Sequence, residues 1–147
     1  MSLKAYYETV EAAIAKLGID PVSSRGKEKE GLWTLTKKDI MVWIDLWEIE
    51  REGRPYFQVM SPLFHVPENA ELRNELFAEL LQINDRLYGG VAFTTFKNWI
   101  YLKIIREADG LSVDEAHASI MRVGSYAERH GEALSNKFNI EIARFNK

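Results

Sequence analysis

Three strand patterns lie close together in the first half of the chain, and the short turns between them constrain the fold more than any other feature of the sequence. β-favouring residues cover 32–36, apolar residues recur at alternate positions over 40–49, and a third strand pattern covers 56–66. The turns have only a few residues, whereas a parallel crossover needs about a dozen or more. The three strands are therefore predicted to pair antiparallel. Because proline cannot donate to a ladder, we expect Pro62 at a sheet edge or a strand end.

Helical patterns precede and follow this group of strands. Residues 3–17 and 67–87 carry apolar side chains at spacings of three and four, which predicts two amphipathic helices. A capping box between Ser112 and Glu115 opens a last helix, whose apolar stripe is predicted to extend to Phe145.

A second strand hairpin is predicted over residues 91–96 and 99–106, turning at Lys97-Asn98. The order of elements is therefore helix, three strands, helix, two strands, helix. This order predicts one α+β domain over residues 1–147, in which helices pack on one face of a five-stranded antiparallel sheet.

Composition excludes several kinds of chemistry. The chain has no cysteine, so a disulfide framework, a thiolate nucleophile and a cysteine-based metal site are ruled out. Its 19 Lys and Arg against 22 Asp and Glu give a net charge of −3, and nucleic-acid binders usually carry a basic excess. Residues 1–17 lack the uninterrupted apolar run of a signal peptide or a membrane span. We therefore expect a cytoplasmic protein that binds neither nucleic acid nor membranes.

The sequence contains no recognisable metal or phosphate-binding motif. His117 and His130 are too far apart for two ligands on one helical turn, and His65 belongs to a strand. Gly89-Gly90 follows a helix, whereas phosphate-binding loops need glycine before a helix N-terminus. We expect no metal, no cofactor and no catalytic residue.

Glu48, Glu50 and Glu52 are the one carboxylate cluster with a possible chemical role. They share strand parity and hence a face, so two of them could act as a general acid and base. The other interpretation is a solvated strand end whose charges discourage edge-to-edge aggregation. The first interpretation predicts an alternative function, a small-molecule-binding protein or enzyme that uses this region of the sheet.

The strand pattern at 40–49 is apolar on both faces, which exceeds what one layer of helices requires. The second face carries Met41, Trp43 and Trp47, and the later hairpin adds Tyr101. Antiparallel sheets with one solvated face normally place polar residues there. Either a curled sheet or a wrapped loop covers these rings, or they form an exposed surface that receives another chain. In the second case Trp43 and Trp47 are the predicted anchors, with Met41 and Tyr101 beside them, because rigid aromatics dominate interface energetics.

The helical pattern at 67–87 is also apolar over more than one seam. Its main stripe runs from Leu72 through Leu80, while Phe77 and Leu81 fall well outside that stripe. The helix either packs between two elements of its own domain or uses Phe77 and Leu81 as the seam of a two-fold homodimer.

The element order and several local segments resemble a bacterial family. The segments are Ser61-Pro62-Leu63-Phe64-His65-Val66-Pro67, Leu80-Leu81-Gln82-Ile83-Asn84, Gly90-Val91-Ala92-Phe93, Trp99-Ile100-Tyr101-Leu102 and Leu111-Ser112-Val113-Asp114-Glu115. Over about residues 31–135 the chain resembles the YbjN-like family of bacterial sensory transduction regulators, and its element order is similar to the type III secretion chaperone-like fold. It departs at the turn Lys97-Asn98, where glycine or aspartate is expected.

The resemblance implies a non-enzymatic protein with no catalytic residues, and the chaperones imply dimers that hold non-globular segments of client proteins. Together with the two-sided strand, it predicts a chaperone-like or regulatory module. We expect a homodimer that docks client or regulatory protein segments on an apolar sheet or helix surface.

Overall fold

The computed structural model describes residues 3–143 and contains eight elements in the predicted order. They are α1 (Leu3–Lys16), β1 (Leu32–Lys37), β2 (Ile40–Ile49), β3 (Arg54–His65), α2 (Ala70–Asn84), β4 (Ala92–Phe96), β5 (Trp99–Glu107) and α3 (Val113–Phe138). All neighbouring strands are antiparallel, in the spatial order β1-β2-β3-β5-β4. The predicted α+β class with a five-stranded antiparallel sheet is confirmed.

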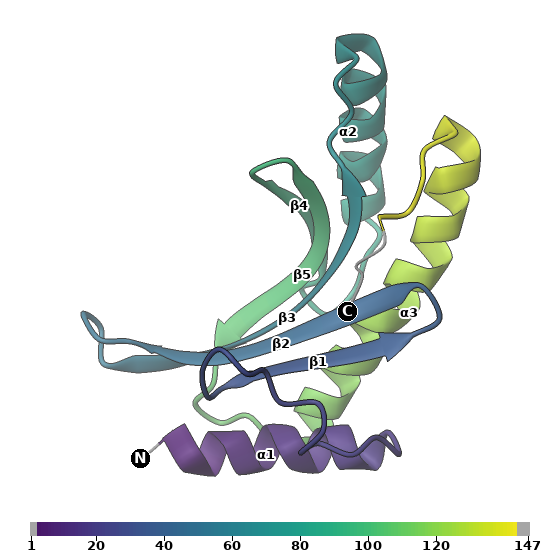
Figure 1. The fold of residues 1–147 in the computed structure, drawn as a ribbon. Coiled ribbons are helices and arrows are strands. Elements are labelled where there is room, and N and C mark those ends of the chain that lie inside the picture. The colour runs from purple at the N-terminus through teal and green to yellow at the C-terminus, as the bar shows by residue number, and fades with distance from the viewer. Residues whose placement is uncertain (1–2, 144–147) are drawn as a thin grey trace.

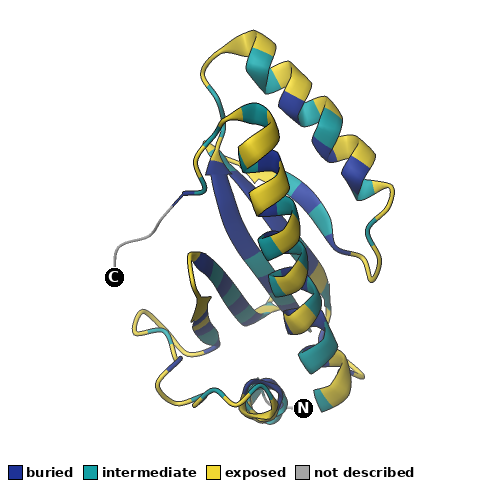
Figure 2. Cartoon of the chain, turned by 90° about the vertical axis from the view of Figure 1, so that its right-hand side faces the viewer, coloured by how far each residue is buried: buried dark blue, intermediate teal, exposed yellow. Residues whose placement is uncertain are grey.

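The three helices lie on one side of the sheet (Figure 1). Figure 2 views this side, with α3 crossing in front of strands that are mostly buried. Alternate residues of each strand point toward the helices and form one core with the apolar stripes of α1, α2 and α3. The largest fully buried side chains are Phe57, Phe64, Ile14, Ile44, Leu63, Leu76, Ile100 and Leu102.

Pro62 lies inside β3, a central strand, so the expectation of an edge or a strand end is wrong. The structure explains how a proline is tolerated there. The ladder between β2 and β3 ends at the pair Trp43–Met60, so β3 has no paired strand on that side at Pro62. On the other side, the register between β3 and β5 shifts between Pro62 and Phe64. A bulge and a local loss of pairing therefore give this proline an edge-like environment within a central strand.

α2 is shorter than the sequence pattern predicts. It starts at Ala70, not at residue 67, because the side chain of Asn69 caps it by accepting a 2.8 Å hydrogen bond from the N–H of Leu72. It ends at Asn84, so Leu87 packs against the core from the following loop.

α3 starts where predicted and ends early. The capping box between Ser112 and Glu115 is present. The helix stops at Phe138 because Asn139 adopts a left-handed conformation with φ of 53°. The chain then returns to the sheet, and the N–H of Ala143 donates a 2.7 Å hydrogen bond to the carbonyl of Leu63. Phe145, the predicted end of the stripe, lies outside the described residues.

Candidate partner-binding surface

The side of the sheet opposite the helices is concave and rich in aromatic side chains. β3 and β5 bend away from β1 and β2, so the sheet curls around this helix-free side (Figure 1). We call it the outer face. On the three central strands it includes Met41, Trp43, Asp45, Trp47, Tyr56, Gln58, Met60, Trp99, Tyr101, Lys103 and Ile105. Its β2 residues are half-buried, whereas Ile40, Val42, Ile44 and Leu46, which point toward the helices, are buried.

Aromatic contacts run across the strands of the outer face. Trp47 stacks on Tyr56 of β3, with ring centroids 6.0 Å apart. Trp43 packs against Tyr101 of β5 at 6.3 Å, and Tyr101 packs against Trp99 at 6.5 Å. Trp47 and Tyr56 are on neighbouring strands, whereas Trp43 reaches across β3 to Tyr101. Because each ring contacts another ring, the surface is preorganised for binding.

The four predicted binding residues all lie on this face, but they are not equally accessible. Met41, Trp43 and Trp47 are half-buried, whereas Tyr101 is only 8% exposed. The curled sheet and the neighbouring rings enclose Tyr101, so we correct its expected exposure. Tyr101 supports the other rings and offers little contact area of its own.

Asp45 lies at the centre of the outer face, between the two β2 tryptophans. It is half-buried, and Nε2 of Gln58 on β3 lies 3.5 Å from its Oδ2. Burial raises the pKa of this carboxyl group, and the charge of Lys29 partly offsets that effect. The carboxylate of Asp45 therefore lies within a largely apolar part of the outer face.

Both edges of the sheet are partly closed to another strand. At β1, residues 24–26 run alongside the strand and form backbone hydrogen bonds of 2.7 and 2.8 Å with Leu32 and Thr34. At β4, the side-chain amide of Asn84 accepts a 2.7 Å hydrogen bond from the N–H of Phe93 and donates one of 3.2 Å to its carbonyl. These contacts occupy edge groups that a partner strand would need. The outer face is therefore more accessible to an extended segment than either edge is.

The two residues of the predicted dimer seam differ in exposure. Leu81 is 70% exposed, whereas Phe77 is half-buried and packs against the core. Leu81 is thus the member of the pair that presents apolar surface to solvent on α2.

The three clustered glutamates are exposed around the hairpin between β2 and β3. Glu52 accepts a 3.2 Å hydrogen bond from the hydroxyl of Tyr56 and pairs with Arg51. Carboxylates spread around a solvated hairpin do not converge on a substrate, which matches the solvated-strand-end interpretation of Glu48, Glu50 and Glu52.

The described residues contain neither a cluster of metal-ligating side chains nor a membrane-spanning helix. Within residues 3–143, no three His, Asp or Glu side chains are grouped so that they could hold a metal ion. The described helices include none with the length and apolar character needed to span a membrane.

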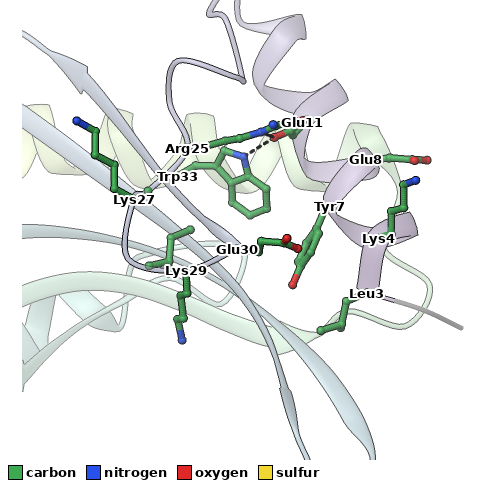
Figure 3. A pocket seen from close by; sticks show the side chains of 13 residues that line it. Leu3, Lys4, Tyr7, Glu8, Glu11, Arg25, Lys27, Lys29, Glu30 and Trp33 are labelled. Carbon is green, nitrogen blue, oxygen red and sulfur yellow. Dashed lines mark hydrogen bonds and ion pairs between the residues drawn. The ribbon is translucent and has the colours of Figure 1, made fainter.

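A second concave region lies between α1 and the loop that precedes β1 (Figure 3). This groove has a volume of about 950 Å³. Glu11 of α1 accepts hydrogen bonds of 2.6 and 2.8 Å from Arg25 and of 2.9 Å from the indole of Trp33. The charged residues that also line it are Lys4, Glu8, Lys27, Lys29 and Glu30. Charged side chains of both signs therefore line the groove.

Glu11→Ala is expected to destabilise the fold by about 2–3 kcal/mol, because the indole N–H of Trp33 would be left buried without an acceptor. Trp33 is only 3% exposed. Urea unfolding at neutral pH measures this loss, and Glu8→Ala on the same helix is the control that should cost much less. The hydrogen bond from Arg25 holds the pKa of Glu11 below its usual value. Its stabilisation should therefore be full at neutral pH and disappear as pH falls through that lowered pKa.

Several residues of the surface carry no clear signal in the sequence. Tyr56 and Trp99 join the outer face through the strand registers, and counting along the hairpin turns could have indicated Tyr56. Asp45 interrupts an apolar face but looks like an ordinary polar strand residue. Asn84 offers no local signal, because tertiary packing brings Phe93 to it.

Comparison with known proteins identifies the fold. No protein-family model matches the sequence, and the curated proteins give no match. A chain in the crystal structure of the ExsC–ExsE complex is 16% identical, with a TM-score of 0.66 over 91% of this chain and 97% of that chain. A chain of the heterodimeric ExoU–SpcU complex from the type III secretion system of Pseudomonas aeruginosa is 14% identical, with a TM-score of 0.58 over 83% and 94%.

This chain has the type III secretion chaperone-like fold. The predicted fold is therefore confirmed at the level of topology as well as class. Both similar chains were solved in complexes with another protein. At identities this low, the similarity establishes the fold and leaves the function to be argued from the surface.

Proposed function

We propose that this chain is a non-enzymatic, chaperone-like protein-binding module that holds an extended segment of a partner protein on its outer face. The observation that carries the proposal is the pair of half-buried tryptophans on the outer face, Trp43 and Trp47. Aromatic surface that is partly open to solvent favours protein contacts, because large rigid rings contribute much of the binding energy of an interface.

We expect the partner segment to bind on the outer face and not to add as a strand at a sheet edge. Residues 24–26 and the side chain of Asn84 already occupy groups at the two edges. A segment lying on the concave face could bury apolar side chains against the rings without displacing those contacts. The likeness to two chains solved in protein complexes supports a protein partner.

The alternative, an enzyme or small-molecule-binding protein that uses Glu48, Glu50 and Glu52, has less support. Those side chains are exposed around a hairpin instead of lining a cavity. The YbjN-like resemblance, the regulatory role that it implies and the cytoplasmic location stay predictions.

A random-sequence peptide library displayed on phage tests the proposal. Peptides selected on the immobilised protein are expected to be apolar at alternate positions, because side chains of an extended segment face a sheet at every second residue. Fluorescence anisotropy should show that the selected peptides bind the folded wild-type protein in solution. They should not bind an unrelated α+β control protein. Recovery of no specific peptide would contradict the proposal.

We further propose that the chain forms a homodimer through the exposed seam on α2. Leu81→Asp is expected to convert a species of twice the 17.0 kDa chain mass into a monomer, because a charge would be buried at the two-fold contact. Light scattering coupled to size-exclusion chromatography measures the mass. Gln82→Asp adds the same charge to the next exposed residue and should leave the dimer intact. A wild-type protein that is monomeric at all accessible concentrations would contradict the dimer.

A further inference from the structure

Asp45 is a half-buried carboxylate on the outer face of β2. Its neighbours on the adjacent strands are Leu32 of β1 and Gln58 of β3. Among the described residues, the one side-chain hydrogen bond that it accepts comes from Gln58 and is long at 3.5 Å. Within residues 3–143, no lysine or arginine forms an ion pair with it. A carboxylate removed from water without a cationic partner destabilises the native state.

The side chains around Asp45 suit a cation. Trp43 and Trp47 flank it on the same face of β2, two residues away on either side. Aromatic rings attract cations through their negative faces, and a carboxylate adds charge and hydrogen-bond acceptors. A guanidinium group uses both, because its planar fork pairs with a carboxylate while its face stacks on a ring.

We infer that Asp45, between Trp43 and Trp47, is the subsite for an arginine side chain of the bound partner segment. This inference rests on the proposed function and specifies the chemistry of the partner. The segment would carry arginine at one position and apolar residues two positions before and after it, since residues two apart in an extended chain share a face. The arginine would form the ion pair that Asp45 lacks within residues 3–143.

The charged groups near Asp45 define how pH should affect such binding. Lys29 from the loop before β1 acts on it electrostatically, and Lys103 and Glu107 lie on β5, beyond β3. Neither Leu32 nor Gln58, the residues aligned with it, titrates. Binding of an arginine-containing peptide is therefore expected to weaken as pH falls through the raised pKa of Asp45, when its negative charge is lost.

Parallel peptide selections on the wild type, Asp45→Asn and Glu48→Gln proteins test the inference. Glu48→Gln is the matched control, because it removes a carboxylate from the same strand on the opposite face. Asp45→Asn keeps the shape and the acceptor for Gln58, and it should not lower the melting temperature. The pattern apolar-any-Arg-any-apolar is expected in the wild-type and Glu48→Gln pools and not in the Asp45→Asn pool.

A double-mutant cycle between Asp45 and the arginine of one selected peptide measures how strongly the two groups interact. Changing its arginine to glutamine should weaken binding to the wild type by about 10-fold or more and should hardly change binding to Asp45→Asn. Selected peptides that lack arginine, but whose binding still depends on Trp43 and Trp47, would overturn this inference and leave the proposed function intact. Peptides that bind equally well without the two tryptophans, or a failure to select any peptide, would overturn the proposed function and this inference together.

Discussion

Replacing Trp43 and Trp47 together with threonine is expected to weaken binding of selected peptides by about 100-fold or more, because each central aromatic of an interface contributes about 2 kcal/mol or more. The chain should remain folded. Both side chains point away from the helical core, and threonine is favoured in strands. Fluorescence anisotropy with a labelled peptide measures the affinity, and circular dichroism reports the fold.

Met121→Thr is the matched control for the double variant. Met121 is also an exposed large apolar residue, but it lies on α3, on the helical side of the sheet. Its replacement should leave peptide affinity within about twofold, since only general surface hydrophobicity is lost. A folded Trp43→Thr, Trp47→Thr protein that binds as tightly as the wild type would show that the outer face is not the docking surface.

Phe57→Ala is expected to have the largest effect on stability, about 3–5 kcal/mol, because it opens a cavity in a closely packed core. Phe57 is fully buried on the inner side of β3, a central strand. Chemical unfolding monitored by circular dichroism measures the difference. In a domain of marginal stability, a loss of this size approaches the whole free energy of folding.

Tyr56→Ala, one residue earlier, tests the same strand from its other side. Tyr56 lies on the outer face and stacks on Trp47, so its loss should destabilise the fold far less than loss of Phe57. The folded Tyr56→Ala protein should nevertheless bind selected peptides more weakly than the wild type does. Equal losses of stability at both positions would mean that the outer face is part of the core.

Local patterns predicted most of the fold because strand periodicity and helix capping depend on residues that are close together in the sequence. Alternation over residues 40–49 gave β2 its bounds, since period two is a property of the strand itself. The capping box at Ser112 likewise marked the start of α3, because both of its hydrogen bonds are local. Pro62 misled the prediction, since a bulge and the end of a ladder depend on the neighbouring strands.

The candidate surface was less predictable than the fold. The pattern identified the face that carries Trp43 and Trp47, but it could not give the curvature that encloses Tyr101. Asn84 and Asp45 acquire their roles from residues far away in the chain or across the sheet. Contacts of this kind arise only when the strand order and the bend of the sheet are known.

The indole N–H signals of the four tryptophans provide the most direct test of the docking surface. Trp43, Trp47 and Trp99 lie on the outer face, whereas Trp33 is buried beside Glu11. In a ¹H–¹⁵N NMR titration with a selected peptide, we expect the signals of Trp43 and Trp47 to shift most, that of Trp99 to shift less, and that of Trp33 to stay unchanged. A titration in which Trp33 shifts while Trp43 and Trp47 do not would contradict the account and place binding at the groove beside α1.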